Sequence, residues 1–394
     1  MDAKLCDTPI TGVHLAESLK EALGPLAILR SAVAEKVAAG QGFMSHILRV
    51  KLTWETQDSL PSSVIVKVCS SDTLSSAFDE MVSTEEHRKQ QKEIMSNGVK
   101  LFHDTECLIY VLFGSSPPIP TPKCYALSRG DAGSLAFIIL EDLSETAGVI
   151  PCLVAALSMN QVLEAVAAVA KLHAWSLVTT VDWRNHVDDM KKREEIFKPF
   201  EHTMRHSYET VKEKYLDTFG TMDVDKILKH ASISAMSQLA VEHREYMDDV
   251  LLHGDFWANN ILFEKRSDGS VGDRVAALID FQLAVKGAPM ADLARLLSWS
   301  VTHELRRERI QEILHHYYDT VKSIAGDKLT ANYKQLEENY HRQFAVQSMH
   351  TLAGLPLMVK YMVKSEKEQR EQDERLFIER IKAGYEDAMK TFEK

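Results

Sequence analysis

The stretch HGDFWANN at residues 253–260 places a carboxylate, Asp255, and an amide, Asn260, directly before two short apolar runs. Between these runs, residues 267–270 read Ser-Asp-Gly-Ser, which is a strong turn signal. The pattern therefore predicts a β-hairpin. A second carboxylate, Asp280, follows the second run, and the hairpin is expected to bring it near Asp255 although 25 positions separate them.

Two carboxylates and an amide are the groups that phosphoryl transfer from ATP requires. Hard oxygen ligands hold Mg²⁺ against the phosphates, and a carboxylate orients the attacking hydroxyl and accepts its proton. Such residues also occur simply as turn and cap residues. An apolar strand that delivers Asp280, and another that carries Lys67, favour a functional set.

The overall composition excludes several other classes of protein. The chain has 394 residues and a formal net charge of −11, which argues against nucleic-acid binding and against docking on an anionic membrane. Its five cysteines show no CxxC spacing, which favours free thiols in a reducing compartment and disfavours structural zinc. The first residues lack a signal-peptide pattern, and no apolar run is long enough to span a membrane. We therefore expect a cytoplasmic protein.

The N-terminal part, residues 1–142, mixes strand-like and helix-like segments, and residues 1–35 form a helical extension of it. Four prolines within residues 117–122 cannot lie inside a helix or a central strand, so an extended connector is expected there. The predicted elements are a helix over 13–23 and strands over 47–53, 64–68 and 136–140.

From about Ser158 the pattern changes to long helical periodicity. Residues 143–394 are expected to form a mostly helical part that contains the catalytic hairpin within residues 251–285. The fold class is therefore α+β, with a small mixed part followed by a large helical part. Helices are predicted over 190–216, 225–250, 290–324, 330–362 and 367–392.

The pattern His-x-Asp-x-x-x-x-Asn resembles the catalytic loop of the kinase superfamily, and Asp280-Phe281 stands where that superfamily has its metal-binding Asp-Phe-Gly. The sequence is more similar to the aminoglycoside-phosphotransferase and choline-kinase branch. Within that branch, residues 253–260 resemble the HGD-x-W-x-N-N signature of the ecdysteroid-kinase-like, or CHK-kinase-like, family of animals. The segment Gly-x-Pro-x-x-Asp-Leu-Ala at 287–294 is similar to the one that follows the metal-binding aspartate there.

The N-terminal part resembles the same family, so the resemblance runs from about residue 36 to residue 300. Residues 64–68 are similar to the strand that carries the ATP-binding lysine, and residues 40–45 to the nucleotide loop. Glu106 matches the lysine-pairing glutamate. Residues 138–143 are similar to the linker whose backbone meets adenine.

The resemblance implies a two-lobed protein-kinase-like fold that uses ATP and Mg²⁺ to phosphorylate a hydroxyl of a small molecule. A lipophilic or steroid-like alcohol is one candidate acceptor. The implied catalytic residues are Asp255 as the base together with Asn260, and Asn260 and Asp280 are also the implied Mg²⁺ ligands. The implied nucleotide-binding residues are Lys67, Glu106, Gly40, Gly42, Glu141 and Leu143.

Some positions depart from the kinase pattern. Gln282 replaces the glycine after Asp280-Phe281, and Gly254 replaces the arginine that protein kinases use to sense activation-loop phosphate. No Ala-Pro-Glu motif follows, so a protein kinase is disfavoured. The alternative that remains is a catalytically silent kinase-like module that binds a partner or ligand. The intact lysine, aspartates and asparagine argue against it.

Several assignments stay open at the level of sequence. Glu85, Glu86 and Glu93 are rivals of Glu106 as partner of Lys67, and residues 107–113 read locally as a strand where the family has a helix. His173 and Asp292 are interpreted as structural supports of the catalytic loop. Trp257 and Trp299 could line either a core or a pocket. The acceptor pocket is expected within 158–250 and 290–365.

Overall fold

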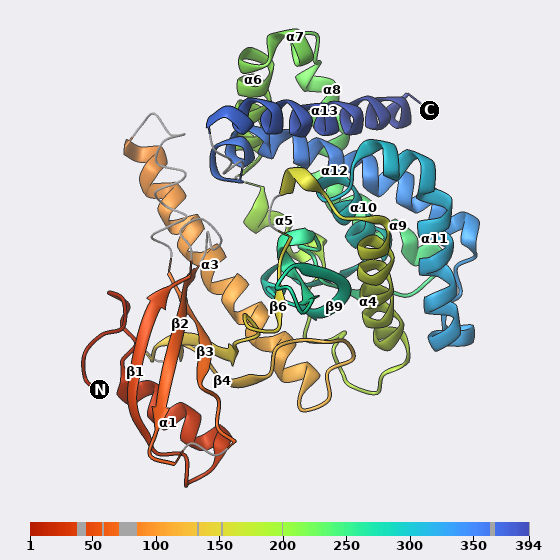
Figure 1. Cartoon of the computed structure of the whole chain (residues 1–394). Coiled ribbons are helices and arrows are strands. Elements are labelled where there is room, and N and C mark those ends of the chain that lie inside the picture. Colours follow the sequence, from red (N-terminus) through yellow and green to blue (C-terminus); the bar gives the residue numbers. More distant parts are fainter. Residues whose placement is uncertain are drawn as a thin grey trace. The chain divides into compact units, whose positions relative to one another are not determined.

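The computed structural model describes residues 1–37, 45–56, 59–70, 85–131, 134–150, 153–198, 200–362 and 367–393 (Figure 1). The chain divides into two compact units. Unit 1 comprises Met1–Gly114 and Thr121–Thr146, and unit 2 comprises Ser115–Pro120 and Ala147–Lys394. The second of these units resumes after Thr146, and it also includes part of the proline-rich connector.

Unit 1 is built on a five-stranded antiparallel sheet with the strand order β1-β2-β3-β5-β4. Buried and exposed residues alternate along β2, where Leu48, Val50 and Leu52 face the core, as expected for a strand with one buried face. The elements of this unit are α1 (Gly12–Leu23), β1 (Leu29–Lys36), β2 (Ser45–Trp54), β3 (Ser63–Cys69), α3 (Glu85–Phe113), β4 (Cys124–Arg129) and β5 (Ala136–Glu141).

Helix α1 covers one face of this sheet. Its N-terminus is capped by Thr11, whose side chain accepts a hydrogen bond from the His14 backbone N–H. Leu15 and Leu19 lie four residues apart on its buried face and pack into the same core as Val66 of β3. The helix predicted over residues 13–23 is therefore confirmed. The helical extension expected over residues 1–35 is wrong beyond this helix, because Leu29–Lys36 form strand β1 of the sheet.

Residues 107–113 belong to helix α3, so the local reading of this run as a strand is wrong. A strand would bury alternate residues, yet Cys107, Tyr110 and Phe113 are buried while Val111 is 57% exposed. That spacing follows the helical repeat. Helix α3 begins before this apolar run and continues through it, and a sequence window of only seven residues is too short to show the helical repeat.

Unit 2 is mostly helical and contains the predicted hairpin, formed by β8 and β9. Two further short strands, β7 and β10, pair with each other, and β6 pairs with β8. The elements are β6 (Ala147–Gly148), α4 (Met159–Val178), α5 (Met190–Phe197), α6 (Phe200–Lys214), α7 (Leu216–Phe219), α8 (Val224–Ala231), α9 (Ile233–Glu242), β7 (Val250–Leu252), β8 (Ile261–Lys265), β9 (Val271–Leu278), β10 (Val285–Gly287), α10 (Met290–Trp299), α11 (His303–Ala325), α12 (Tyr333–Met362) and α13 (Lys367–Phe392).

Three of the predicted helices are divided in the structure. The region 190–216 forms α5, α6 and the start of α7, and 225–250 forms α8, α9 and the start of β7. The region 290–324 breaks between α10 and α11, where the Thr302 side chain accepts a hydrogen bond from Leu305 N and begins a new helix. Apolar periodicity continues across these breaks, so it does not reveal them.

Two tryptophans, Trp257 and Trp299, belong to the hydrophobic core of unit 2 or pack against it. Trp299 is 3% exposed and belongs to a cluster built mainly from α12, α13 and the helices packed on them, visible in blue and green in Figure 1. Trp257 packs against this cluster, with its ring centroid 5.8 Å from that of Trp299. Both side chains therefore serve the core.

The connector residues within unit 2 support the hairpin. Ile119 is 3% exposed, and the carbonyl oxygen of Pro120 accepts a hydrogen bond from Leu278 N at 2.9 Å. Leu278 is the last residue of β9, two positions before Asp280. None of the helices in the described part of the chain is long and apolar enough to cross a bilayer.

Candidate functional site

The first half of the predicted site lies in unit 1, where Lys67 of β3 contacts Glu106 of α3. The two atoms Nζ and Oε2 are 2.6 Å apart, and the residues are only 7% and 2% exposed. A buried charge is strongly disfavoured without an opposite charge beside it, so the two residues depend on each other. The rival side chains of Glu85, Glu86 and Glu93, and the whole of Gly40 and Gly42, lie outside the described residues.

The alternation of strand β3 explains how a lysine comes to be buried there. Val66 and Val68 pack into the core that includes α1, so Lys67 points to the opposite face of the sheet. Its backbone lies between those of Ile47 in β2 and Ile138 in β5. A central strand of a sheet thus fixes the lysine, and α3 brings the glutamate to it.

The predicted linker residues Glu141 and Leu143 follow directly on β5. Glu141 N donates to the carbonyl oxygen of Lys123 at 2.8 Å, and the Leu143 carbonyl oxygen accepts from Thr146 N at 3.1 Å. Asp142, which sequence reasoning missed as a structural residue, accepts hydrogen bonds from Ser63 Oγ at 2.8 Å and Arg49 Nε at 3.1 Å.

These contacts stabilise the ionised form of Asp142. Burial alone would raise the pKa of its carboxyl, but hydrogen bonds from Ser144 and Ser63 and the charge of Arg49 together lower that pKa. The linker is therefore held against β2 and β3 by a charged group, and its backbone has a defined position.

The predicted catalytic residues Asp255 and Asn260 lie in unit 2, where they are in direct contact. Asn260 Nδ2 donates to the Asp255 carbonyl oxygen at 2.9 Å and to Asp255 Oδ2 at 3.0 Å. The short helical turn Ala258–Asn260 brings the amide back onto the loop. Because the Nδ2 group faces Asp255, the amide oxygen of Asn260 is turned away from that carboxylate.

Asp292, on the first turn of α10, fixes the backbone of the same loop. Its two carboxylate oxygens accept from His253 N at 2.7 Å and from Gly254 N at 2.9 Å. His173 Nε2 lies 3.1 Å from Asp292 Oδ2, and His173 Nδ1 lies 2.9 Å from the hydroxyl of Tyr317. His173 and Asp292 are both almost fully buried, and they act as supports of the loop.

Gly254 cannot be replaced by a larger residue in this loop. Its φ of +81° is a conformation that residues with a side chain rarely adopt. A Cβ atom there would lie 2.0 Å from the carbonyl oxygen of Leu283, so the backbone passes too close for any side chain. The glycine that stands where protein kinases carry an arginine is thus required by packing.

The hairpin brings the residues around Asp280 to the catalytic loop. Ile279 N donates to the Asn260 carbonyl oxygen at 3.0 Å, and the Ile279 carbonyl oxygen lies 3.0 Å from His253 Nε2. Asp280 itself has φ of 69° and ψ of 66°, a left-handed conformation that is uncommon for residues other than glycine and is enriched at functional sites.

Arg295 is a member of this site that sequence reasoning missed. It lies on α10 one turn after Asp292, and it donates to Asp255 Oδ1 from Nε at 3.2 Å and from Nη2 at 2.6 Å. The only signal in the sequence is this one-turn spacing from Asp292. Each carboxylate oxygen of Asp255 therefore already accepts a hydrogen bond from a protein side chain.

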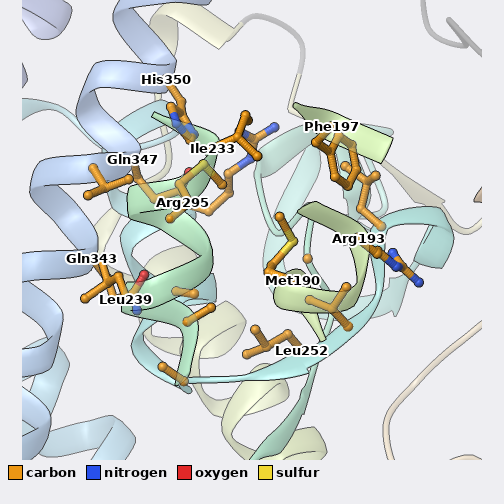
Figure 2. A pocket seen from close by; sticks show the side chains of 18 of the residues that line it. Met190, Arg193, Phe197, Ile233, Leu239, Leu252, Arg295, Gln343, Gln347 and His350 are labelled. Carbon is orange, nitrogen blue, oxygen red and sulfur yellow. The ribbon is translucent and has the colours of Figure 1, made fainter. Parts of the chain in front are cut away.

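A pocket of about 300 Å³ lies next to this loop, entirely within unit 2 (Figure 2). Residues Gly254, Asp292 and Arg295 form part of its wall, so it borders the catalytic loop directly. Helices α9, α10 and α12, together with α5, supply most of the rest, in keeping with the segments expected to form the acceptor pocket. Its apolar lining includes Met190, Phe197, Ile233, Leu239, Leu252 and Val346.

Two titratable groups in the pocket wall have strongly lowered pKa values. Burial lowers the pKa of Arg193 from 12.5 to about 10, which leaves it charged at neutral pH. Burial lowers the pKa of His350 to about 4, although its hydrogen bond to the Ala231 carbonyl oxygen opposes this, and the charge of Arg295 lowers the pKa further. His350 is therefore uncharged at neutral pH.

Comparison with known proteins identifies the family. A family model described as "DUF1679: Uncharacterized oxidoreductase dhs-27" matches residues 5–394. The chain belongs to this family. A DUF1679 relative from Caenorhabditis elegans, "Uncharacterized oxidoreductase dhs-27", is 25% identical over 340 residues, which cover 82% of this chain and 39% of that protein.

A second relative from Caenorhabditis elegans, "Uncharacterized kinase-like protein D1044.1", is 33% identical over 117 residues, or 30% of this chain and 29% of that protein. The chain thus spans less than half the length of either relative. The predicted relationship to kinase-like proteins is confirmed, and so is the α+β fold. Its strand-borne lysine and helix-borne glutamate are the arrangement found in protein kinases.

Solved structures show a more distant likeness. The Plasmodium vivax ethanolamine kinase Pv091845 is 13% identical with a TM-score of 0.46, over 90% of this chain and 82% of that chain. The choline kinase LicA from Streptococcus pneumoniae is 15% identical with a TM-score of 0.42, over 96% and 99%. Likeness at this level carries no argument about function, which has to come from the residues of the DUF1679 chain.

Proposed function

We propose that this DUF1679 protein is an ATP- and Mg²⁺-dependent kinase that transfers the γ-phosphate to a hydroxyl of a small, mainly lipophilic alcohol. The observation that carries the proposal is the buried ion pair between Lys67 and Glu106. Kinases of this fold class require such a pair to hold the nucleotide phosphates. The carboxylate of Asp255, anchored by an arginine that lines a pocket, supplies the second half of the argument.

Unit 1 would bind the nucleotide. Lys67 would contact the α- and β-phosphates while Glu106 keeps its ammonium group in position, and the backbone of Glu141 and Leu143 would meet adenine. Gly40 and Gly42 would let the backbone approach the phosphates, a role that rests on the sequence alone.

The residues of unit 2 fit a magnesium ion that is bound together with nucleotide. Over the described ranges, no cluster of three histidine, cysteine, aspartate or glutamate side chains could hold a metal ion by itself. Mg²⁺ in nucleotide sites commonly takes only one or two protein ligands besides water and phosphate oxygens. The amide oxygen of Asn260 and the carboxylate of Asp280 would be these ligands. Bound there, the ion would neutralise charge on the phosphates.

The proposed reaction uses Asp255 as the base. Its carboxylate accepts the proton of the acceptor hydroxyl while the hydroxyl oxygen bonds to the γ-phosphorus. The bond between that phosphorus and the β–γ bridging oxygen breaks, and ADP leaves with the electron pair. Asn260 and Arg295 hold the carboxylate in one orientation. Oδ1 already accepts two hydrogen bonds from Arg295, whereas Oδ2 accepts one from Asn260 and keeps a lone pair for the proton.

The name of the first relative raises oxidoreductase chemistry as another candidate. Dinucleotide-dependent oxidoreductases commonly bind their cofactor at the ends of a parallel sheet flanked by helices. Throughout the part of this chain that the structure describes, the paired strands are antiparallel. No observation on this chain therefore favours that candidate.

The test measures ATP turnover and nucleotide binding separately. The chain is incubated with Mg-ATP and a library of alcohols, and ADP formation is followed. The variant Asp255→Asn, which keeps an oxygen for Arg295, should lose about a hundred- to ten-thousand-fold in turnover and keep its thermal shift with Mg-ATP. The matched control is Asp268→Asn, which alters an exposed aspartate in the turn of the same hairpin.

Two results would count against the proposal. If millimolar Mg-ATP does not raise the melting temperature of the unaltered chain, the silent kinase-like module is the better description. If Asp255→Asn turns over ATP as fast as Asp268→Asn, another group is the base.

A further inference from the structure

We infer that Gln343 and Gln347 of α12 select the acceptor, by hydrogen bonding to neutral polar groups of an uncharged, mainly apolar molecule. This inference rests on the proposed function, because it assigns the specificity of that kinase's acceptor pocket. It concerns two side chains that take no part in the phosphoryl-transfer step.

Each amide has one buried polar atom that lacks a hydrogen-bond partner among the described residues. Gln343 is 5% exposed, and the atom is its Nε2. Gln347, on the next turn of α12, is half-buried, and the atom is its Oε1. Most buried polar atoms in proteins find a partner, so two neighbouring exceptions in the wall of one pocket require an explanation. A bound molecule that supplies the missing partners provides one.

The two amides present complementary groups to the pocket. Residues four apart on a helix lie on the same face, and Figure 2 shows Gln343, Gln347 and His350 on α12, across the pocket from Met190 and Phe197 of α5. One open atom donates a hydrogen bond and the other accepts one. Hydroxyl groups do both, so an oxygenated ligand can satisfy them.

The charged groups of the wall disfavour a cationic acceptor. Among the described residues that line the pocket, Asp292 is the only carboxylate, and both of its oxygens accept hydrogen bonds from the backbone N–H groups of His253 and Gly254. The remaining charged residues of the wall, Arg193, Lys286 and Arg295, are basic. An ammonium group would therefore lose its hydration without gaining a free counter-ion, since the nearby carboxylate of Asp255 is already paired with Arg295.

The apolar part of the wall sets the other half of the specificity. Met190 and Phe197 of α5 lie across the pocket from the amides, and Ile233 and Leu239 of α9 add to its apolar lining. Together these side chains would cover a compact hydrocarbon body. Arg295 joins the same wall to Asp255, so a molecule held by the two amides would lie beside the catalytic carboxylate.

The experiment uses three probes of nearly equal size: adamantanol, adamantanediol and the cationic amino-adamantanol. Their affinities for the chain are measured by calorimetry with Mg-ATP analogue present. We expect the diol to bind at least about ten-fold more tightly than the amino-alcohol, and Gln343→Met to remove most of the advantage of the diol over the mono-alcohol. The control is Gln369→Met, on the exposed part of α13.

Two further measurements separate recognition from a structural role. Gln347→Glu places a carboxylate in the wall and should reverse the preference, so that the amino-alcohol binds more tightly than the diol. Gln343→Met should raise the melting temperature, because it removes a buried polar atom that lacks a partner, whereas loss of a structural amide would lower it.

The inference is overturned if none of the probes binds, if the unaltered chain binds diol and amino-alcohol equally, or if Gln347→Glu leaves their order unchanged. None of these results would affect the Mg-ATP thermal shift or the dependence of turnover on Asp255. The two proposals can therefore fail separately.

Discussion

Arg295 donates two hydrogen bonds to Oδ1 of Asp255, while Asn260 donates to Oδ2. The side chains of Arg295 and Asp255 are 23% and 12% exposed, so solvent screens the pair only weakly. A carboxylate held from both sides has little freedom to rotate. The base of the proposed reaction is therefore oriented before any substrate arrives, and preorganisation of this kind is a main source of rate enhancement.

Arg295→Gln should lower kcat by about ten- to a hundred-fold because a misoriented base costs rate, and it should leave the thermal shift with Mg-ATP unchanged. The measurement is kcat and acceptor KM with the best alcohol from the library screen. Arg295→Lys keeps the charge but loses the fork of two donors, so only partial recovery is expected. The control is Arg309→Gln on the exposed side of α11. An unchanged kcat in Arg295→Gln would show that Asp255 does not need this partner.

Lys67→Met should lower the free energy of unfolding by about 3–5 kcal/mol, because it leaves Glu106 buried without its counter-ion. The double variant Lys67→Met/Glu106→Leu removes both charges and should recover most of that loss, yet still bind no Mg-ATP. Urea unfolding and thermal shift measure the two effects. The control is Lys51→Met, on an exposed position of β2. A double variant as unstable as the single one would contradict the assignment.

Asp292→Asn should cost about 2–4 kcal/mol of stability, since an amide cannot accept from two backbone N–H groups as a carboxylate does. The loss should be local, so hydrogen exchange at the amides of His253 and Gly254 should rise more than exchange in α12. Asp327→Asn, at a fully exposed position, is the control. If the amides of His253 and Gly254 exchange equally slowly in both variants, Asp292 does not support this loop.

Stability should depend on pH through His350. Its pKa is lowered from 6.5 to about 4 by burial, so the unfolded chain takes up a proton below pH 6.5 while the folded chain does not. The free energy of unfolding should therefore fall between pH 6.5 and pH 4, by up to about 3 kcal/mol. The variant His350→Gln lacks this contribution. Urea unfolding of both proteins at several pH values tests it, and parallel curves would refute it.

The sequence predicted those features that depend on local order. The catalytic loop, the hairpin and the strand of Lys67 are each encoded within a few neighbouring residues, so motif and periodicity are enough. The Lys67–Glu106 contact joins residues 39 positions apart, and the sequence left three other glutamates as rivals of Glu106. Only the fold of α3 against β3 brings Glu106 to the lysine.

Other features could not be predicted because they depend on tertiary packing. The Arg295–Asp255 pair joins residues 40 positions apart, and nothing in the composition of α10 distinguishes this arginine from others. The two glutamines of α12 look like ordinary polar positions of a long helix until the pocket beside them is known. The break at Thr302 is likewise hidden, because apolar spacing continues across it.

The segment Ser115–Pro120 limits where the chain can be cut into separate fragments. The chain passes between its two units at three junctions. Pro120, at the end of this segment, provides the carbonyl oxygen that accepts a hydrogen bond from Leu278 N at the end of β9. A fragment that begins at Ala147 would lose that acceptor, two residues before Asp280. The helical unit should therefore not be produced by cutting the chain at this junction alone.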